Sequence, residues 1–183
     1  MLNRVVTAAA LAVGGMMLSK QLKKGKGSSS QGVSSVEESI EINVPVRTAY
    51  NQWTQFEEFP KFMKNVLEIK QLDDKHLHWR AKVGLEEKEW DVKITEQIPD
   101  KRIAWRSVSG PRNGGVATFH KISDNVTRIM LQIDYEPDGV LEKLGDAMGA
   151  VRMEARTGLQ CLKEMLEQRG SETGAWRGKI GQH

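Results

Sequence analysis

The 183 residues leave room for one domain of ordinary size with some additional sequence, and two full domains are not expected. Hydrophobic residues make up 39% of the chain, enough to bury a core, which excludes a chain that is disordered throughout. The net charge of +3 divides unevenly, with +5 on residues 1–35 and −2 on residues 36–183, so the folded part lacks the basic surface of a nucleic-acid-binding domain.

The first 35 residues contain an apolar segment followed by a linker. Residues 5–18 are apolar and lie between Arg4 and Lys20, but as a helix they would reach only about 21 Å, against a hydrocarbon core of about 30 Å. The segment therefore spans a membrane, lies on its surface or forms a free tail, and we expect membrane contact through residues 2–26. The run is not followed by a signal-cleavage pair, and the lysines after it place the domain in the cytoplasm. Residues 25–35, rich in Gly and Ser, predict a flexible linker.

The rest of the chain predicts a domain at 36–168 and a flexible C-terminal tail at 169–183. Alternating apolar and polar residues predict about seven strands, at residues 36–44, 66–72, 76–83, 89–98, 103–105, 116–122 and 126–135. One or two short helices are expected between the first two strands. From Asp138 onward apolar residues recur at spacings of three and four, which predicts a closing helix of about 28 residues. This order indicates an α+β domain in which a curved antiparallel sheet wraps around a long C-terminal helix.

Three stretches of this domain resemble a known superfamily. They are residues 53–63 (WTQFEEFPKFM), the segments KEWDV and EQIPDKRIAWRS within 88–107, and Thr118-Phe119 in a later strand. Over residues 36–168 the chain is similar to the START-like, or SRPBCC, superfamily, and within it to the bacterial polyketide cyclase/dehydrase and coenzyme Q-binding proteins. The resemblance implies the helix-grip fold, with a cavity between sheet and helix. It also implies a hydrophobic ligand, since related proteins of this fold bind lipids, quinones, hormones or polyketides.

Aromatic and thioether side chains on the inward faces are the candidate ligand contacts. A ring ligand would find stacking and apolar surface among them, and they are Trp79, Trp90, Trp105, Phe119, Tyr135 and Met148. The alternative is that all six fill an ordinary core. Trp53 and Trp176 are expected at the surface or in the tail. Two charged residues, Glu96 in phase with Trp90 and Arg128 in phase with Met130, are candidate polar contacts of the ligand.

No set of residues in the sequence predicts a catalytic or metal site. His76 and His78 lie two apart on one strand and are expected to face solvent, and two histidines without a third ligand make a weak metal site. Cys161 is expected to pack on the closing helix rather than act as a nucleophile, and as the only cysteine it allows no internal disulfide. His120 is expected at the surface. The glycine-rich residues 110–115 fall between strands, where they predict a loop at a cavity mouth rather than a phosphate-binding loop.

The residues and the resemblance together favour a non-catalytic protein that binds or carries a hydrophobic small molecule, such as a quinone, lipid or polyketide-like compound, close to the membrane. No cofactor or metal is expected. A cyclase or dehydratase acting on an aromatic or polyketide substrate is the first alternative, and it would need a general acid or base in the cavity. A stress-related interaction module, which binds partners through its surface, is the second alternative.

Overall fold

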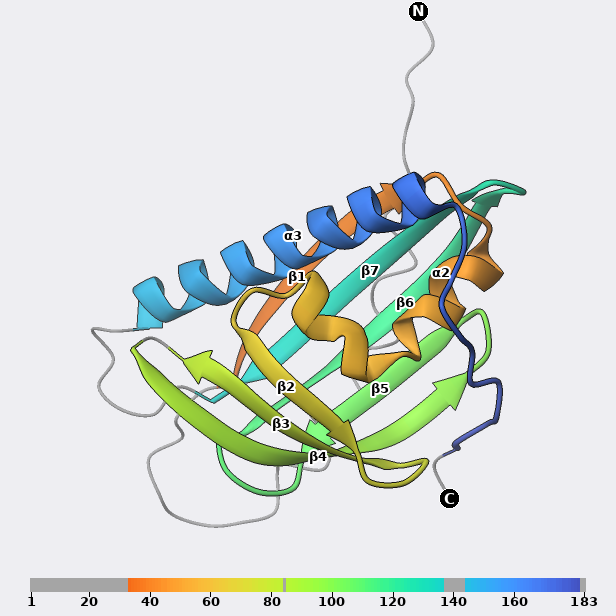
Figure 1. The fold of residues 1–183 in the computed structure, drawn as a ribbon. Coiled ribbons are helices and arrows are strands. Elements are labelled where there is room, and N and C mark those ends of the chain that lie inside the picture. The colour runs from red at the N-terminus through yellow and green to blue at the C-terminus, as the bar shows by residue number, and fades with distance from the viewer. Residues whose placement is uncertain (1–32, 84, 137–143, 182–183) are drawn as a thin grey trace, which may run out of the picture. The chain divides into compact units, whose positions relative to one another are not determined.

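The computed structural model describes residues 33–83, 85–136 and 144–181, and they form one curved sheet with helices on its concave face (Figure 1). In chain order the elements are β1 (Ser34–Ile42), α2 (Val46–Trp53), the 3-10 helix η1 (Phe56–Lys61), β2 (Val66–Gln71), β3 (His76–Val83), β4 (Glu86–Ile98), β5 (Arg102–Ser107), β6 (Asn113–Ser123), β7 (Val126–Tyr135) and α3 (Leu144–Arg169). The seven strands pair antiparallel in the order β1-β7-β6-β5-β4-β3-β2. This arrangement confirms the helix-grip fold expected from the sequence.

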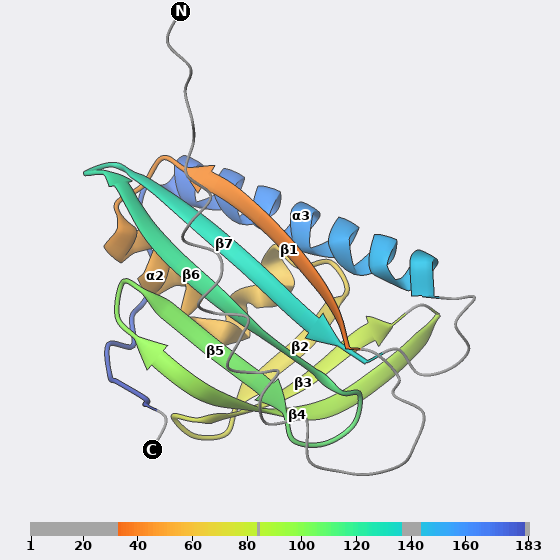
Figure 2. The ribbon, with the colours of Figure 1, turned by 180° about the vertical axis from the view of Figure 1, so that it is seen from behind.

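The helices divide the concave face between them. α3 runs along β1, α2 lies against β6 and β7, and η1 lies against β2 at the other edge of the sheet (Figure 1). Seen from behind, the sheet shows its other face, on which none of the described helices lies (Figure 2). The inner face is therefore the place where a cavity can form.

The core follows from two periodicities in the sequence. On β7 every second residue is buried, with Thr127, Ile129 and Leu131 at most 1% exposed. On α3 the buried side chains recur at spacings of three and four, at Ala155, Leu159, Leu162 and Leu166. The two stripes face each other, so the second half of α3 is fixed on the sheet.

A bulge in β4 changes which polar residue points inward. The pairing of β4 with β5 shifts register between Ile94 and Glu96, which adds one residue to the alternation. Gln97, rather than Glu96, is then the buried residue, at 1% exposed. The expectation that Glu96 points inward is therefore wrong, and its carboxylate pairs with Arg102, with Oε2 and Nε 2.6 Å apart.

The structure describes the C-terminal residues as far as 181 but not the first 32 residues. The apolar residues 2–26 and most of the expected linker lie outside the described residues, as do Asp138 and the expected first turns of the closing helix. Among the described helices, none is long and apolar enough to cross a membrane. At the other end the expected flexible tail is not what the structure shows. Residues 171–181 lie along α2 and the sheet, and Ile180 is only 5% exposed and forms an isolated antiparallel bridge with Gln97.

We predict that replacing Leu162 by Ala will lower the free energy of unfolding by about 2 to 5 kcal/mol, because the side chain is fully buried between α3 and the sheet. Met153→Ala is the matched control, since Met153 lies on the same helix and is 63% exposed. Urea denaturation followed by circular dichroism measures both. Equal stability of the two variants would contradict the packing described for α3.

Candidate functional site

A cavity lies between the inner face of the sheet and the α2–η1 segment, and its volume is about 180 Å³. Its walls are almost entirely apolar or aromatic. The described residues that line it are Trp53, Phe56, Phe59, Met63, Leu77, Trp79, Trp90, Val92, Ile94, Ile103, Trp105, Asn113, Leu131 and Ile133. We call this space the tryptophan cavity.

Strand alternation and register bring two of the tryptophans together. Trp79 on β3 and Trp90 on β4 are directly opposite each other in the antiparallel pair, so their side chains leave the sheet on the same face. The two rings are stacked, with centroids 6.1 Å apart and planes 23° from parallel. They form a flat aromatic wall of the kind that accommodates another ring.

Trp105 lies on the sheet because its cross-strand partner has no side chain. Its partner on β6 is Gly115, and a Cβ at that position would be 2.5 Å from Cζ2 of the Trp105 ring. The same Cβ would also be 2.5 Å from the carbonyl oxygen of Gln132 on β7. Glycine at 115 thus keeps the indole of Trp105 close to the sheet and out of the middle of the cavity.

The opposite wall is built from α2 and η1. Trp53, at the end of α2, packs edge-on against Phe59 of η1, with centroids 5.5 Å apart. Phe59 in turn meets Trp79 on the sheet edge-to-face at 6.0 Å. Trp53 is only 2% exposed, so the expectation that it lies at the surface is wrong. Its spacing from Ala49 and Tyr50, both fully buried, is the helical signal that could have placed it inside.

Three of the residues that line the cavity, Trp79, Trp90 and Asn113, carry polar side-chain atoms. The indole Nε1 atoms of Trp79 and Trp90 are buried and have no hydrogen-bond acceptor among the described residues. Asn113 donates from Nδ2 to the carbonyl oxygen of Pro111, 3.1 Å away, and its backbone N–H donates to Oγ of Ser107. A buried donor without an acceptor is unfavourable, so a ligand oxygen that reached either indole N–H would remove that cost.

The structure brings three of the six candidate ligand contacts to this cavity, namely Trp79, Trp90 and Trp105. Phe119 lies behind the wall instead, edge-on to Tyr50 and Trp53 at 5.4 and 5.8 Å. Tyr135 ends β7 outside the lining, and burial raises the pKa of its hydroxyl. Met148 is on α3, from which no described residue lines the cavity. The expectation that these six residues contact a ligand remains a prediction.

The other residues considered from the sequence lie outside the cavity. Arg128 does share a face with Met130, but this is the outer face, where its guanidinium pairs with Glu41. His76 and His78 are bonded through Nδ1 to Asp73 and Asp91, at 2.9 and 2.8 Å.

The loop expected at residues 110–115 is shorter in the structure, because Asn113 begins β6 and Gly114 and Gly115 are strand residues. The part that does form a loop lies against β4. Gly110 has a φ of +65°, and a Cβ there would be 2.7 Å from Cβ of Trp90, whose ring lines the cavity. Only glycine allows this turn to lie so close to the strand. The loop thus covers part of the backbone that carries the aromatic wall.

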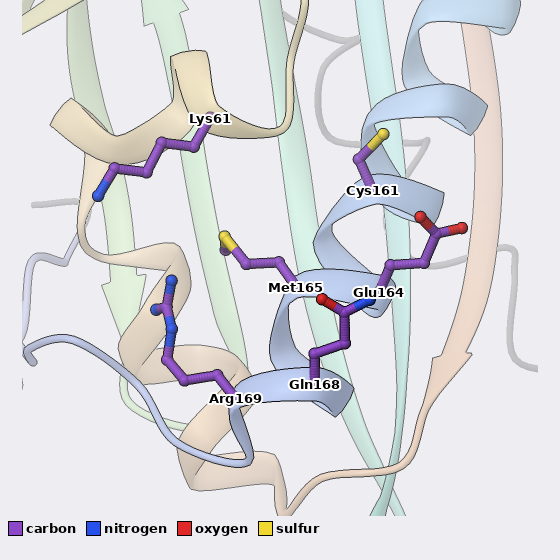
Figure 3. Close-up of a pocket in the computed structure, with 6 residues that line it drawn as sticks. All are labelled: Lys61, Cys161, Glu164, Met165, Gln168 and Arg169. Carbon is purple, nitrogen blue, oxygen red and sulfur yellow. The ribbon is translucent and has the colours of Figure 1, made fainter.

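A second, open groove of about 490 Å³ separates η1 from the C-terminal half of α3 (Figure 3). It is lined by Lys61, Cys161, Glu164, Met165, Gln168 and Arg169. Lys61 is already paired with Glu58 at 2.9 Å, and Arg169 donates to Oε1 of Gln52 at 3.2 Å. Because both cations have partners within the protein, this groove offers a ligand less than the tryptophan cavity does.

Sequence comparison identifies the family to which this fold and cavity belong. Residues 42–161 match the family model described as polyketide cyclase / dehydrase and lipid transport. The chain belongs to this family. An uncharacterised 17.2 kDa protein of Streptomyces lincolnensis is 52% identical over 149 residues, which are 81% of this chain and 99% of that protein.

Solved structures show the same fold at low sequence identity. A Thermus thermophilus protein has a TM-score of 0.67 and 18% identity, and the match covers 75% of this chain and all of that one. An aromatase/cyclase from a Streptomyces species has a TM-score of 0.65 and 13% identity, and the match covers 79% of this chain and all of that one. A START superfamily protein of Mycobacterium smegmatis has a TM-score of 0.58 and 14% identity, and the match covers 75% of this chain and 97% of that one. The polyketide cyclase / dehydrase family member described here therefore has the START-like fold.

We predict that Gly115→Ala will move the ring of Trp105 and lower the free energy of unfolding by about 1 to 3 kcal/mol, because the added methyl group meets both the indole and the backbone of β7. Near-ultraviolet circular dichroism reports the ring, and urea denaturation reports the stability. Gly149→Ala on α3 is the control, since its methyl group would meet nothing within 4 Å, and we expect it to be neutral or slightly stabilising. An unchanged aromatic spectrum in Gly115→Ala would contradict the role given to Gly115.

Proposed function

We propose that the protein binds, and carries without altering, a compact hydrophobic molecule that contains rings and at least one oxygen acceptor. The supporting observation is the tryptophan cavity itself, in which stacked aromatic walls accompany the buried indole N–H groups of Trp79 and Trp90. Ligand sites of this kind are mostly apolar, with a few polar groups that fix the orientation of the ligand. Ring stacking supplies the affinity here, and the N–H groups favour an oxygenated ligand over a plain hydrocarbon.

The cavity volume narrows the choice among the ligand classes considered. A closed apolar cavity of about 150 Å³ holds a single benzene ring, whereas drug-sized ligands occupy about 300 to 1,000 Å³. At about 180 Å³, the tryptophan cavity suits one ring or two fused rings. A quinone head group or a small aromatic polyketide fragment fits this description better than a long acyl or prenyl chain, for which the wall would have to move.

Binding is favoured over acid–base catalysis by the chemistry of the walls. General acid–base catalysis needs a titratable group within hydrogen-bond reach of the reacting atom. None of the described residues lining the cavity has one, since Asn113 and the indoles do not titrate near neutral pH. The Streptomyces aromatase/cyclase shares the fold at 13% identity. A cyclase role is therefore the alternative function, and conversion of a bound compound would reveal it.

Calorimetric titration with 2-naphthol, a fused two-ring phenol, tests the proposal. We expect binding to the parent protein, weaker binding of naphthalene, which lacks the oxygen, and a loss of at least about tenfold in affinity for 2-naphthol in Ile133→Phe, because the larger side chain fills the cavity. Met130→Phe is the matched control, since Met130 lies on the outer face of the same strand. We expect it to bind like the parent.

Three results would overturn the proposal. Equal affinity for 2-naphthol in Ile133→Phe and Met130→Phe would place the binding site outside the tryptophan cavity. Conversion of a bound aromatic or polyketide-like compound, detected by mass spectrometry after incubation, would establish the cyclase alternative. Retention of palmitate with no binding of 2-naphthol would favour a lipid ligand over a compact ring.

A further inference from the structure

We propose that residues 171–181, here called the clasp, hold the α2–η1 wall on the sheet and so set the rate at which the tryptophan cavity exchanges its ligand, with Arg177 as the main positioning residue. The part of this inference that concerns ligand exchange rests on the proposed function, whereas the part that concerns the α2–η1 wall does not. Figure 1 shows the clasp running from the end of α3 past α2. It bears on the site because α2 and η1 supply one side of the cavity.

The α2–η1 wall depends on contacts from outside itself. α2 has eight residues and no side-chain hydrogen bond at its N-cap, and isolated helices shorter than about 12 to 15 residues are marginal in water. η1 is a six-residue 3-10 helix with Pro60 inside it. Neither element would keep this shape alone, so the residues that pack on it decide how firmly it is held.

The clasp bonds to four residues of this wall. The Glu172 carboxylate accepts from Nδ2 of Asn51 at 2.8 Å, and the backbone N–H of Thr173 donates to Oε1 of Gln52 at 3.0 Å. Two further bonds join Oγ1 of Thr173 to Glu58 at 2.8 Å and the backbone N–H of Trp176 to Oγ1 of Thr54 at 3.0 Å. Asn51, Gln52 and Thr54 are each at most 2% exposed. Buried polar side chains of α2 thus take their partners from the clasp, which makes the bonds costly to lose.

The clasp is fixed at its other side to the sheet. Ile180 exchanges backbone hydrogen bonds with Gln97 on β4, at 2.7 and 3.0 Å. The indole N–H of Trp176 donates to Asp74, in the turn between β2 and β3, at 3.2 Å. The clasp therefore joins α2 to β4 and to the β2–β3 turn.

Arg177 connects both sides at one point. Its guanidinium forms a bidentate pair with Asp100, at 2.7 and 2.9 Å, and also donates to Oδ1 of Asn51 at 2.7 Å. Asp100 occupies the β4–β5 turn with a φ of +61°, a conformation that few non-glycine residues adopt. Bidentate pairing is specific in geometry as well as favourable in energy. Arg177 therefore fixes α2 relative to the end of β4.

Arg177 also reaches the cavity wall through a series of aromatic contacts. The guanidinium carbon lies 5.7 Å from the centroid of the buried Tyr50 ring, within the range of a cation–π contact. Tyr50 is edge-on to Phe119, and Phe119 is edge-on to Trp53, which lines the cavity. Releasing the clasp would free the end of α2 that carries Trp53.

Hydrogen exchange on the ligand-free protein, read by mass spectrometry, tests the clasp directly. In Arg177→Gln we expect exchange in residues 46–63 to rise at least about tenfold while β6 and β7 stay within about threefold of the parent, because the opening is local. Arg177→Lys keeps the charge without the bidentate geometry, so we expect an intermediate rise and a variant that folds. Lys179→Gln removes an exposed charge from the same segment and is expected to change nothing.

The functional half of the proposal is read from the dissociation rate of 2-naphthol, followed by tryptophan fluorescence in stopped flow. We expect at least about a tenfold faster release in Arg177→Gln and parent-like release in Lys179→Gln. A uniform rise in exchange across the sheet, or no rise in residues 46–63, would overturn the clasp. Faster hydrogen exchange in residues 46–63 with an unchanged release rate would show that the clasp only stabilises the wall, and would refute its role in ligand exchange. Failure of 2-naphthol to bind the parent would count against the proposed function alone.

Discussion

The edge-to-face packing of Phe119, Trp53 and Phe59 between sheet and helix is the interaction on which the rest of the structure depends. Trp53 meets Phe119 on β6 at 5.8 Å and Phe59 on η1 at 5.5 Å. Each such pair contributes about 0.5 to 1.5 kcal/mol beyond the area it buries. Because the rings are large and rigid, they fix the position of the α2–η1 wall over the inner face of the sheet, and the tryptophan cavity lies between the two.

Under the proposed function, the buried indole N–H groups make the cavity selective for an oxygenated ligand. A buried N–H without an acceptor costs about 1 to 3 kcal/mol, and Trp79 and Trp90 each present one. An oxygenated ring that accepts from either indole removes that cost, which a hydrocarbon of equal size cannot do. A wall built from phenylalanine would lack this preference, so under the proposed function tryptophan at these two positions contributes to recognition as well as to packing.

The sheet, the closing helix and three of the cavity tryptophans could be predicted from the sequence because each rests on a local period. The strand period of two placed Leu77, Trp79 and Trp90 on one face, and the structure keeps them there. The inward position expected for Glu96 failed at the bulge after Ile94, which changes the phase by one residue and has no signature in the alternation.

What could not be predicted are contacts between segments far apart in the chain. The C-terminal residues are typical of a polar tail because the large apolar residues Trp176 and Ile180 are separated by Arg, Gly and Lys and belong to no longer periodic run. Their partners are on α2, η1, the β2–β3 turn, β4 and the β4–β5 turn. The side-chain partners of Arg177, Asp100 and Asn51, are 77 and 126 residues away. The composition of a segment indicates whether it has enough apolar side chains to be buried. It does not indicate whether distant segments of the chain provide hydrogen-bond partners for its polar groups.

The most direct test of the tryptophan cavity is a nuclear magnetic resonance titration of the five indole N–H groups with 2-naphthol, assigned by substituting each tryptophan with phenylalanine. We expect the resonances of Trp79 and Trp90 to shift downfield as their protons gain an acceptor. The resonances of Trp105 and Trp53 should shift because of the nearby ligand ring, and that of Trp176 should not change. Binding that moves Trp176 while Trp79 and Trp90 remain unchanged would contradict a ligand site in the tryptophan cavity.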